Sequence, residues 1–288
     1  MSERPKTPAR AAVWSCDPAA PQTFASLDSA PFPEFARGTV WLTGAGPGAP
    51  GLLTLLAYHA LTTADVVVHD SLVGDGIMAL VPGATRRIHA GKRGGKPSAK
   101  QADITDTLIA HARAGVRVLR LKGGDPFMFG RGGEEAGALK AAGIPFRIVP
   151  GVSSGLGGLA YAGLPATHRD INQAVTFLTG HDLSGTLPTA IDWPAVARGS
   201  PVIVMYMAAK HLSAIAQNLL GAGRPADDPV AVIASATLPE QELMTLTLAE
   251  AVTPLALPTP AIIVVGAAVT MTDRLAWFDA ARSHGLMG

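Results

Sequence analysis

Cysteine is nearly absent from this chain, aromatic residues are few, and no apolar run approaches the length of a membrane span. The single cysteine, Cys16, cannot form an internal disulfide, which fits a reducing compartment. The longest apolar runs, 202–209 and 261–265, are much shorter than the roughly 20 residues of a spanning helix, and the first residues lack a signal-peptide core. A net charge of +1 is not the basic excess of a dedicated nucleic-acid binder. We expect a soluble, cytoplasmic protein that binds neither nucleic acid nor membranes.

The chain is rich in small and apolar residues. The 288 residues include 32 glycines and are 48% hydrophobic, which is typical of α/β proteins with tight helix–sheet contacts. Residues 1–37 are rich in proline and alanine and show no helical or strand period, so we expect a flexible N-terminal extension there. From residue 39 onward, β-rich runs alternate with helix-like stretches, which predicts repeated β-α units.

The predicted strands fall into two sets. The first set, expected to form a mainly parallel sheet, comprises 39–43, 65–69, 85–90, 116–121 and 146–149. The second set includes a hairpin-like pair, which predicts a mixed sheet, and comprises 174–179, 201–206, 229–234, 244–248 and 261–265. We therefore predict two α/β domains, at 38–150 and 151–288, with a ligand cleft between them.

Helices are expected between these strands, at 52–61, 134–142 and 153–162, and from Ser98 to about Gly115. The last of these has the clearest pattern. Ser98 and Gln101 form a capping box, and Gly115 can end the helix. Its buried face is predicted from residues spaced four apart: Ile104, Leu108 and Ala112.

The segment at 121–135, Leu-Lys-Gly-Gly-Asp-Pro-Phe-Met-Phe-Gly-Arg-Gly-Gly-Glu-Glu, carries the strongest signal of a functional site. Its five glycines remove side-chain bulk, so the backbone can approach a ligand closely. Because it follows a predicted parallel strand, it should lie at the sheet edge where ligands bind. Asp125, Arg131 and Glu134 are its candidate functional side chains, although Glu134 could merely complement a helix dipole.

Two further features lie at the ends of predicted strands. The loop 44–51, Gly-Ala-Gly-Pro-Gly-Ala-Pro-Gly, resembles a loose dinucleotide-binding fingerprint, but Pro47 and Pro50 remove amide donors that a pyrophosphate would need. Dinucleotide binding and a simple tight turn both stay open for it. Asp70 ends the strand Val-Val-Val-His-Asp, where it is either a site carboxylate or a turn residue.

Cations cluster without acids between Asp75 and Asp103, which favours an anionic ligand or a basic rim. The cluster comprises Arg86, Arg87, Lys92, Arg93, Lys96 and Lys100. Its Gly-Lys-Arg-Gly-Gly-Lys core at 91–96 lacks the nucleotide-hydrolase phosphate-loop pattern. His168-Arg169 and His181-Asp182 follow turns and could extend a site, and Met207, at a strand end, could contact a thioether or an adenine.

Taken in order, these motifs resemble those of uroporphyrinogen-III C-methyltransferases, which belong to the tetrapyrrole methylases. The matching segments are the 44–48 loop, Val-Val-His-Asp70, Gly-Lys92-Arg-Gly-Gly, the 121–135 run, Val-Pro-Gly151, Thr-His-Arg169 and Val-Met-Tyr-Met207. The resemblance runs from about residue 38 to 269. It implies transfer of two methyl groups from S-adenosylmethionine to carbons C2 and C7 of uroporphyrinogen III, which gives precorrin-2 for corrin, sirohaem or related synthesis.

The resemblance also assigns site residues and assembly. It implies a homodimer without a metal, in which the cofactor is folded between the two domains. Asp70 and Lys92 match acid–base positions, and Arg131, Glu134 and Arg169 match substrate-side positions. The cofactor pocket would be lined by Pro47, Gly123, Gly124, Asp125, Met128, Ser153, Ser154, Met207 and Ala236. Two of these matches depart from the common pattern, because Ser153-Ser154 replaces a threonine-containing version and Ala236 stands where glycine is frequent.

The proposed chemistry suits these residue types. An apolar pocket with one carboxylate, Asp125, can hold a cationic sulfonium, and clustered cations suit an acceptor with eight carboxylates. A pyrrole carbon becomes more nucleophilic when its ring nitrogen loses a proton, and Asp70 and Glu134 compete as the base. Two alternatives stay open: a methylase of the same fold with another acceptor, and a non-catalytic or dinucleotide-dependent α/β protein. We expect a stand-alone methyltransferase, without the dehydrogenase–ferrochelatase module that is fused to some relatives.

Overall fold

The computed structural model describes residues 32–90, 101–182 and 184–278. The described residues from Glu34 onward form one compact unit that contains both sheets described below. The predicted extension at 1–37 lies almost wholly outside the described residues. The predicted division at residues 150 and 151 stays a prediction. Within the described parts of the chain, no helix is both long and apolar enough to cross a bilayer.

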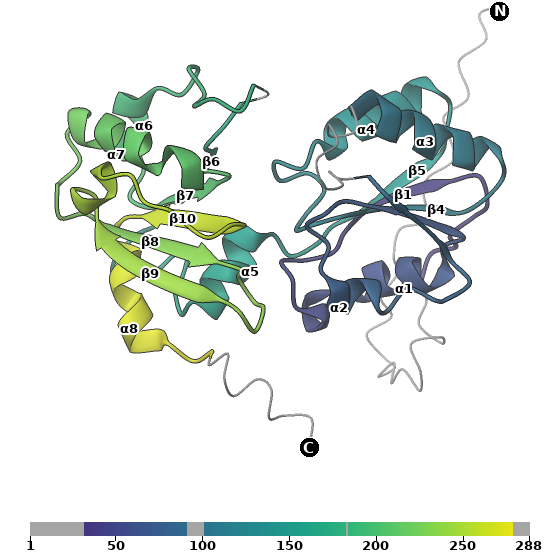
Figure 1. The fold of residues 1–288 in the computed structure, drawn as a ribbon, viewed down its shortest axis with the longest axis horizontal. Helices are drawn as coiled ribbons and strands as arrows, with labels where there is room; N and C mark the ends of the chain where they lie inside the picture. Colours follow the sequence, from purple (N-terminus) through teal and green to yellow (C-terminus); the bar gives the residue numbers. More distant parts are fainter. Residues whose placement is uncertain (1–31, 91–100, 183, 279–288) are drawn as a thin grey trace, which may run out of the picture. The chain divides into compact units, whose positions relative to one another are not determined.

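The first sheet contains five parallel strands in the order β3-β2-β4-β1-β5 (Figure 1). The strands are β1 (Val40–Gly44), β2 (Val66–His69), β3 (Arg86–His89), β4 (Val118–Lys122) and β5 (Phe146–Val149). All five were predicted, with ends that differ by no more than a few residues. Because all strands run in the same direction, their carboxyl ends meet at one edge, and the loops that follow them are brought together there.

Helices cover both faces of this sheet, as Figure 1 shows. The helices are α1 (Leu55–Thr63), α2 (Asp75–Met78), α3 (Gln101–Arg113) and α4 (Gly132–Ala141). Helices α1 and α2 pack on the face that carries Trp41 and Leu119, whereas α3 and α4 pack on the face that carries Leu42 and Val118. The inner strands β1, β2 and β4 are thus buried on both sides, which explains their largely apolar character.

Local sequence accounts for the helix ends. In α3, the predicted stripe of Ile104, Leu108 and Ala112 is buried, and Gly115 follows with a φ of 77°; the predicted cap Ser98 lies outside the described residues. Helix α1 begins at Leu55 rather than at residue 52, because Thr54 accepts a hydrogen bond from the Ala57 amide as its N-cap.

The second sheet is mixed, as predicted, with the strand order β6-β7-β10-β8-β9. Only β6 and β7 pair in parallel, and the other neighbours are antiparallel. The strands are β6 (Thr176–Thr179), β7 (Ile203–Tyr206), β8 (Pro229–Ala234), β9 (Glu242–Thr247) and β10 (Ala261–Val265). Helix α7 (Leu212–Gly221) packs on one face together with α6 (Trp193–Gly199), and α5 (Ser154–Tyr161) packs on the other. A short helix, α8 (Thr272–Leu275), follows β10.

Candidate functional site

Three glycines form a close backbone crossing at the carboxyl edge of the first sheet. Gly44 ends β1, Gly124 follows β4 and Gly151 follows β5, and β1 lies between the other two strands. A Cβ atom added to Gly44 would lie 2.4 Å from the Gly124 carbonyl oxygen, and one added to Gly151 would lie 2.3 Å from the same atom. Only glycine fits at these two positions, which explains part of the glycine richness of the sequence.

Hydrogen bonds join the loops that cross there. Gly46 and Gly124 exchange two backbone hydrogen bonds, with N···O distances of 3.2 and 2.7 Å. The Asp125 carboxylate accepts from the amides of Phe127 (2.8 Å) and Gly151 (3.0 Å), and so links the loop after β4 to the loop after β5. Asp125 therefore has a structural role in addition to the cation-binding role that we predict for it.

Asp70 links another pair of loops at the same edge. Its Oδ1 accepts from the Leu72 amide at 3.0 Å, and its Oδ2 accepts from the Gly123 amide at 3.3 Å. The interpretation of Asp70 as a turn residue is thus correct, because its Oδ1 accepts from an amide two residues along the chain. Because Asp70 also lines the pocket described next, the site interpretation stays compatible with the geometry.

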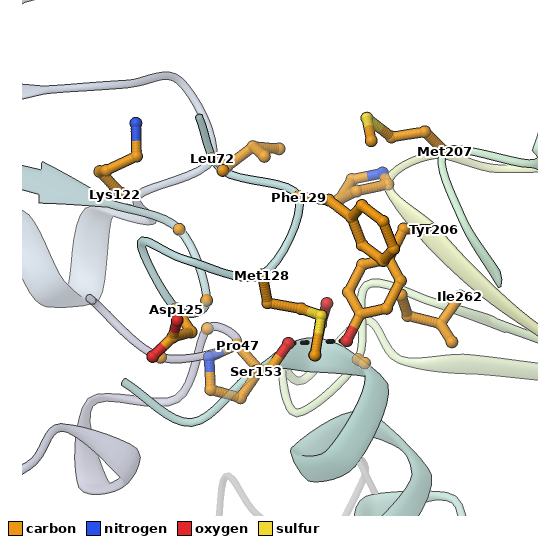
Figure 2. Close-up of a pocket in the computed structure, with 18 of the residues that line it drawn as sticks. Pro47, Leu72, Lys122, Asp125, Met128, Phe129, Ser153, Tyr206, Met207 and Ile262 are labelled. Carbon is orange, nitrogen blue, oxygen red and sulfur yellow. Dashed lines mark hydrogen bonds between the residues drawn. The ribbon is translucent and has the colours of Figure 1, made fainter. Parts of the chain in front are cut away.

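A pocket of about 350 Å³ lies beside this crossing, between residues of the first sheet and residues of the second (Figure 2). Its volume is in the range of small-molecule sites. All nine residues that we predict to bind the cofactor line it: Pro47, Gly123, Gly124, Asp125, Met128, Ser153, Ser154, Met207 and Ala236. These residues come from five separate segments of the chain, so their convergence is a property of the fold rather than of local sequence.

The predicted catalytic and substrate-side residues are distributed differently. Asp70 and Arg131 line the pocket, whereas Glu134 and Arg169 do not. Glu134 is exposed and forms a bidentate pair with Arg131, with N···O distances of 2.9 and 2.7 Å, and this pairing lowers the pKa of its carboxyl group. Arg169 is exposed between α5 and β6. Of the two candidate bases, the geometry favours Asp70.

The predicted basic cluster lies mostly outside the described residues, including Lys92, Arg93, Lys96 and Lys100. Arg87 is described on β3, where its guanidinium donates to the Val81 carbonyl at 2.8 Å. The His168 and His181 pairs, which we considered as extensions of the site, do not line the pocket.

The loop at 44–51 uses most of its amide groups within the protein. The amides of Ala45 and Gly46 donate to the carbonyls of Lys122 and Gly124, and the Ala49 amide donates to the Thr237 hydroxyl at 3.0 Å. A pyrophosphate at this loop would need free amides and a helix that begins there, but α1 begins only at Leu55. The geometry therefore disfavours the dinucleotide interpretation.

Sequence reasoning missed several residues that shape the pocket. Leu72, Phe129 and Tyr206 line it, and the rings of Phe129 and Tyr206 are 5.0 Å apart. Phe129 belongs to the loop after β4, whereas Tyr206 ends β7, so this contact joins the two sheets across the pocket (Figure 2). Aromatic residues are usual in cores, and only the position of Tyr206 beside Met207 at a strand end could have drawn attention to it.

Strained backbone is concentrated around the pocket. Within the described ranges, the non-glycine residues with positive φ are Phe129, Arg131, Met207, Ser235 and Thr237. The first four line the pocket, and the last is flanked by the lining residues Ala236 and Leu238. Such conformations cost about 1–3 kcal/mol each and tend to occur at functional sites. Their placement supports the pocket as the functional centre.

A buried charge cluster was also missed. Glu135, in the first turn of α4, is fully buried, and its Oε1 accepts from Arg120 Nε at 3.0 Å, Lys122 Nζ at 3.2 Å and Gln101 Nε2 at 2.9 Å. Burial and the nearby Arg120 lower the pKa of the Lys122 ammonium, while Glu135 and Asp70 oppose that shift. The sequence signal was the pair Arg120 and Lys122, two residues apart and therefore on one face of an otherwise apolar strand.

We expect Tyr206→Phe to destabilise the fold by about 1–3 kcal/mol. The Tyr206 hydroxyl bonds to the Ser153 hydroxyl at 2.7 Å and accepts from the Gly155 amide at 3.0 Å, and all three groups are buried. Burial raises the pKa of this phenol, so it stays protonated. Urea denaturation measures the change. Tyr58→Phe is the control, since the Tyr58 hydroxyl makes no hydrogen bond within the described residues; equal effects of both changes would contradict the assignment.

Comparisons with known proteins agree with this arrangement. The model of the Tetrapyrrole (Corrin/Porphyrin) Methylases matches residues 39–252. The chain is 58% identical over 252 residues to a uroporphyrinogen-III C-methyltransferase from Sinorhizobium sp, which covers 86% of this chain and 90% of that protein. It is 47% identical over 242 residues to siroheme synthase 3 from Aeromonas hydrophila subsp. hydrophila, covering 84% of this chain. The chain spans about half the length of that siroheme synthase, 51%.

Solved structures show the same fold. The uroporphyrin-III C-methyl transferase of Thermus thermophilus, complexed with S-adenyl homocysteine, is 38% identical and superposes with a TM-score of 0.71 over 81% of this chain and 99% of that one. A cobalt precorrin-4 methyltransferase is 26% identical, with a TM-score of 0.71 over 83% of this chain and 99% of that one. On the family match, the sequence identity and the shared fold, the chain belongs to the tetrapyrrole (corrin/porphyrin) methylase family.

Proposed function

We propose that this protein is an S-adenosylmethionine-dependent methyltransferase that methylates uroporphyrinogen III at carbons C2 and C7 and produces precorrin-2. One observation carries the proposal above all. The nine residues that match the cofactor site of uroporphyrinogen-III C-methyltransferases converge on a single pocket. The likeness to the Sinorhizobium enzyme, 58% identical over 90% of its length, supports the same acceptor.

The pocket fits the methyl donor. Its walls include the apolar side chains of Met128, Met207 and Ile262, and Gly46, Gly123 and Gly124 beside the crossing expose backbone to it. A cationic sulfonium can lie against such apolar and carbonyl surfaces with one carboxylate, Asp125, close by. When bound, S-adenosylmethionine supplies an electrophilic methyl group. The remaining chemistry belongs to the side chains around it and to the alignment that they impose.

Asp70 is the residue that we propose as the base. Its carboxylate is oriented by the amides of Leu72 and Gly123, which leaves further lone pairs to accept the proton of a pyrrole nitrogen. Arg131 lines the pocket, and the Nη1 side of its guanidinium, which the pair with Glu134 does not use, is suited to a carboxylate of the acceptor. Glu134 pairs with Arg131 and would orient that guanidinium. Roles for Lys92 and Arg169 on the acceptor side are carried over from the family motif alone.

Methyl transfer under anaerobic conditions tests the proposed function. The purified protein should consume about two S-adenosylmethionine molecules per uroporphyrinogen III, and mass analysis should find a doubly methylated product. Asp70→Asn should lower kcat at least about tenfold, because a positioned base contributes that much or more. Absence of methylated uroporphyrinogen, or efficient methylation of a later corrin precursor instead, would contradict the proposal.

Assembly and location form a separate part of the proposal. We propose that the enzyme is a cytoplasmic homodimer, as the family resemblance implies. Light scattering of the purified protein should report twice the mass of one 29.5 kDa chain. A monomer at assay concentrations that is fully active would contradict the dimer.

A further inference from the structure

We propose that Lys122 is a carboxylate-binding residue of the pocket and that Glu135 positions its ammonium for that task. The inference rests on the proposed function, because both substrates of that reaction carry carboxylates. The acceptor carries them on its side chains, and the methyl donor carries one at its amino-acid end. The shared chemistry is an ammonium–carboxylate contact in a partly dry site, where such a bond is strong.

Glu135 brings together three donors from different parts of the fold. Gln101 begins α3, Arg120 and Lys122 lie on β4, and Glu135 itself lies in α4. All three donors share a single oxygen of Glu135, at distances from 2.9 to 3.2 Å. Two of the three, Gln101 and Lys122, also line the pocket, whereas Glu135 does not. The buried carboxylate therefore holds two polar groups in the pocket wall without reaching the ligand itself.

Within the cluster itself, positive charge exceeds negative charge by one. Two cations, Arg120 and Lys122, share one carboxylate, and all three side chains are at most 5% exposed. A buried net charge is costly unless an opposite charge approaches it. Asp70 lies within electrostatic reach of Lys122, but the two side chains form no ion pair. A ligand carboxylate would complete the neutralisation.

Of the two cations, Lys122 is the one that can donate further hydrogen bonds to a ligand. The Arg120 guanidinium donates to Glu135 and also to the carbonyls of Val68 and Leu121, and it does not line the pocket. An ammonium has three N–H groups, and within the described residues the Lys122 ammonium donates to Glu135 alone. Figure 2 shows Lys122 on the side of the pocket opposite Tyr206 and Ile262. Lys122 thus lines the pocket from the first sheet, and its ammonium has N–H groups that no described residue accepts.

Lys122→Met tests the proposal in the full-length chain. The change removes the charge and leaves Arg120 and Glu135 as a balanced pair, so folding should persist. Isothermal titration with S-adenosylhomocysteine measures the donor side, and steady-state kinetics with uroporphyrinogen III measures the acceptor side. We expect about a tenfold or larger loss on one side, in Kd or in KM respectively, because a charge-assisted hydrogen bond is lost. The side that changes identifies the source of the carboxylate.

Matched variants separate this role from a structural one. Lys140→Met removes the same charge from the exposed end of α4 and should change neither constant by more than about twofold. Lys122→Arg keeps the charge and should recover most of the affected constant. If Lys122→Met does not fold, Lys122→Gln replaces it in both measurements, because the glutamine amide keeps a donor to Glu135.

The outcomes are distinct. The assignment of Lys122 would be overturned if a folded variant without the charge kept both the Kd for S-adenosylhomocysteine and the KM for uroporphyrinogen III. It would also be overturned if Lys122→Met and Lys122→Gln both failed to fold. Equal losses in Lys122→Arg and Lys122→Met would overturn it as well. Failure of the proposed function would be visible separately, as a wild-type protein that does not methylate uroporphyrinogen III.

Discussion

Gly44→Ala should raise the Kd for S-adenosylhomocysteine by about 100-fold. The added methyl group would lie 2.4 Å from the Gly124 carbonyl oxygen and 2.6 Å from the Gly151 Cα atom, so the loops after β4 and β5 would have to separate. Overpacking costs about 1–3 kcal/mol, and here the obstructing atoms are backbone rather than flexible side chains. Because Gly124 and the residues after Gly151 line the pocket, the displacement should reach the ligand directly.

Isothermal titration on the purified variants measures this change. Gly51→Ala is the matched control, because it adds a methyl group to the same loop at a position with open space around it. We expect its Kd to stay within about twofold of the wild-type value. Gly151→Ala, whose added methyl would meet the same carbonyl at 2.3 Å, should behave like Gly44→Ala. Wild-type affinity in both crossing variants would show that the pocket does not depend on this crossing.

Glu135→Gln should lower the free energy of unfolding by about 3–5 kcal/mol, the cost of removing one partner from a buried ion cluster. The substitution leaves Arg120 and Lys122 buried without the carboxylate that both contact, and it places an amide where three donors now converge. Urea denaturation followed by circular dichroism measures the loss, with the midpoint and the slope both reported.

The neighbouring residue provides the control for Glu135→Gln. Glu134→Gln makes the same chemical change one position earlier, in an exposed pair with Arg131 whose side chains are 56% and 43% exposed. Such pairs contribute at most about 1 kcal/mol. A similar loss of stability in both variants would contradict the distinction between the buried cluster and the surface pair.

Much of the fold follows from patterns that are local in sequence. The strands β5, β8 and β10 were predicted to the residue, because each is a short apolar run between turn residues. The stripe of Ile104, Leu108 and Ala112 placed α3 on the sheet, since its spacing fits one helical face. The start of α1 was predicted about one turn too early, because Pro50 begins a separate turn and Thr54 caps the helix.

The candidate site was less predictable, because it is assembled by long-range contacts. The glycine content of the 121–135 run and the 44–51 loop marked both as candidate ligand-binding segments. Their crossing with Gly151, however, depends on the order of strands in the sheet. Glu134 and Glu135 are equivalent in sequence, and only the fold reveals that the first is exposed and the second fully buried. Tyr206 gave no signal of its own, since its partners Ser153 and Gly155 lie about 50 positions away.

The pocket beside the glycine crossing is the proposed binding site of the methyl donor. A crystal structure of the protein with S-adenosylhomocysteine tests it most directly. We predict that the ligand lies against Pro47, Gly123, Asp125 and Met207, with its sulfur directed toward the side of the pocket that Asp70 and Arg131 line. S-adenosylhomocysteine bound elsewhere on the protein, with this pocket empty, would contradict the account.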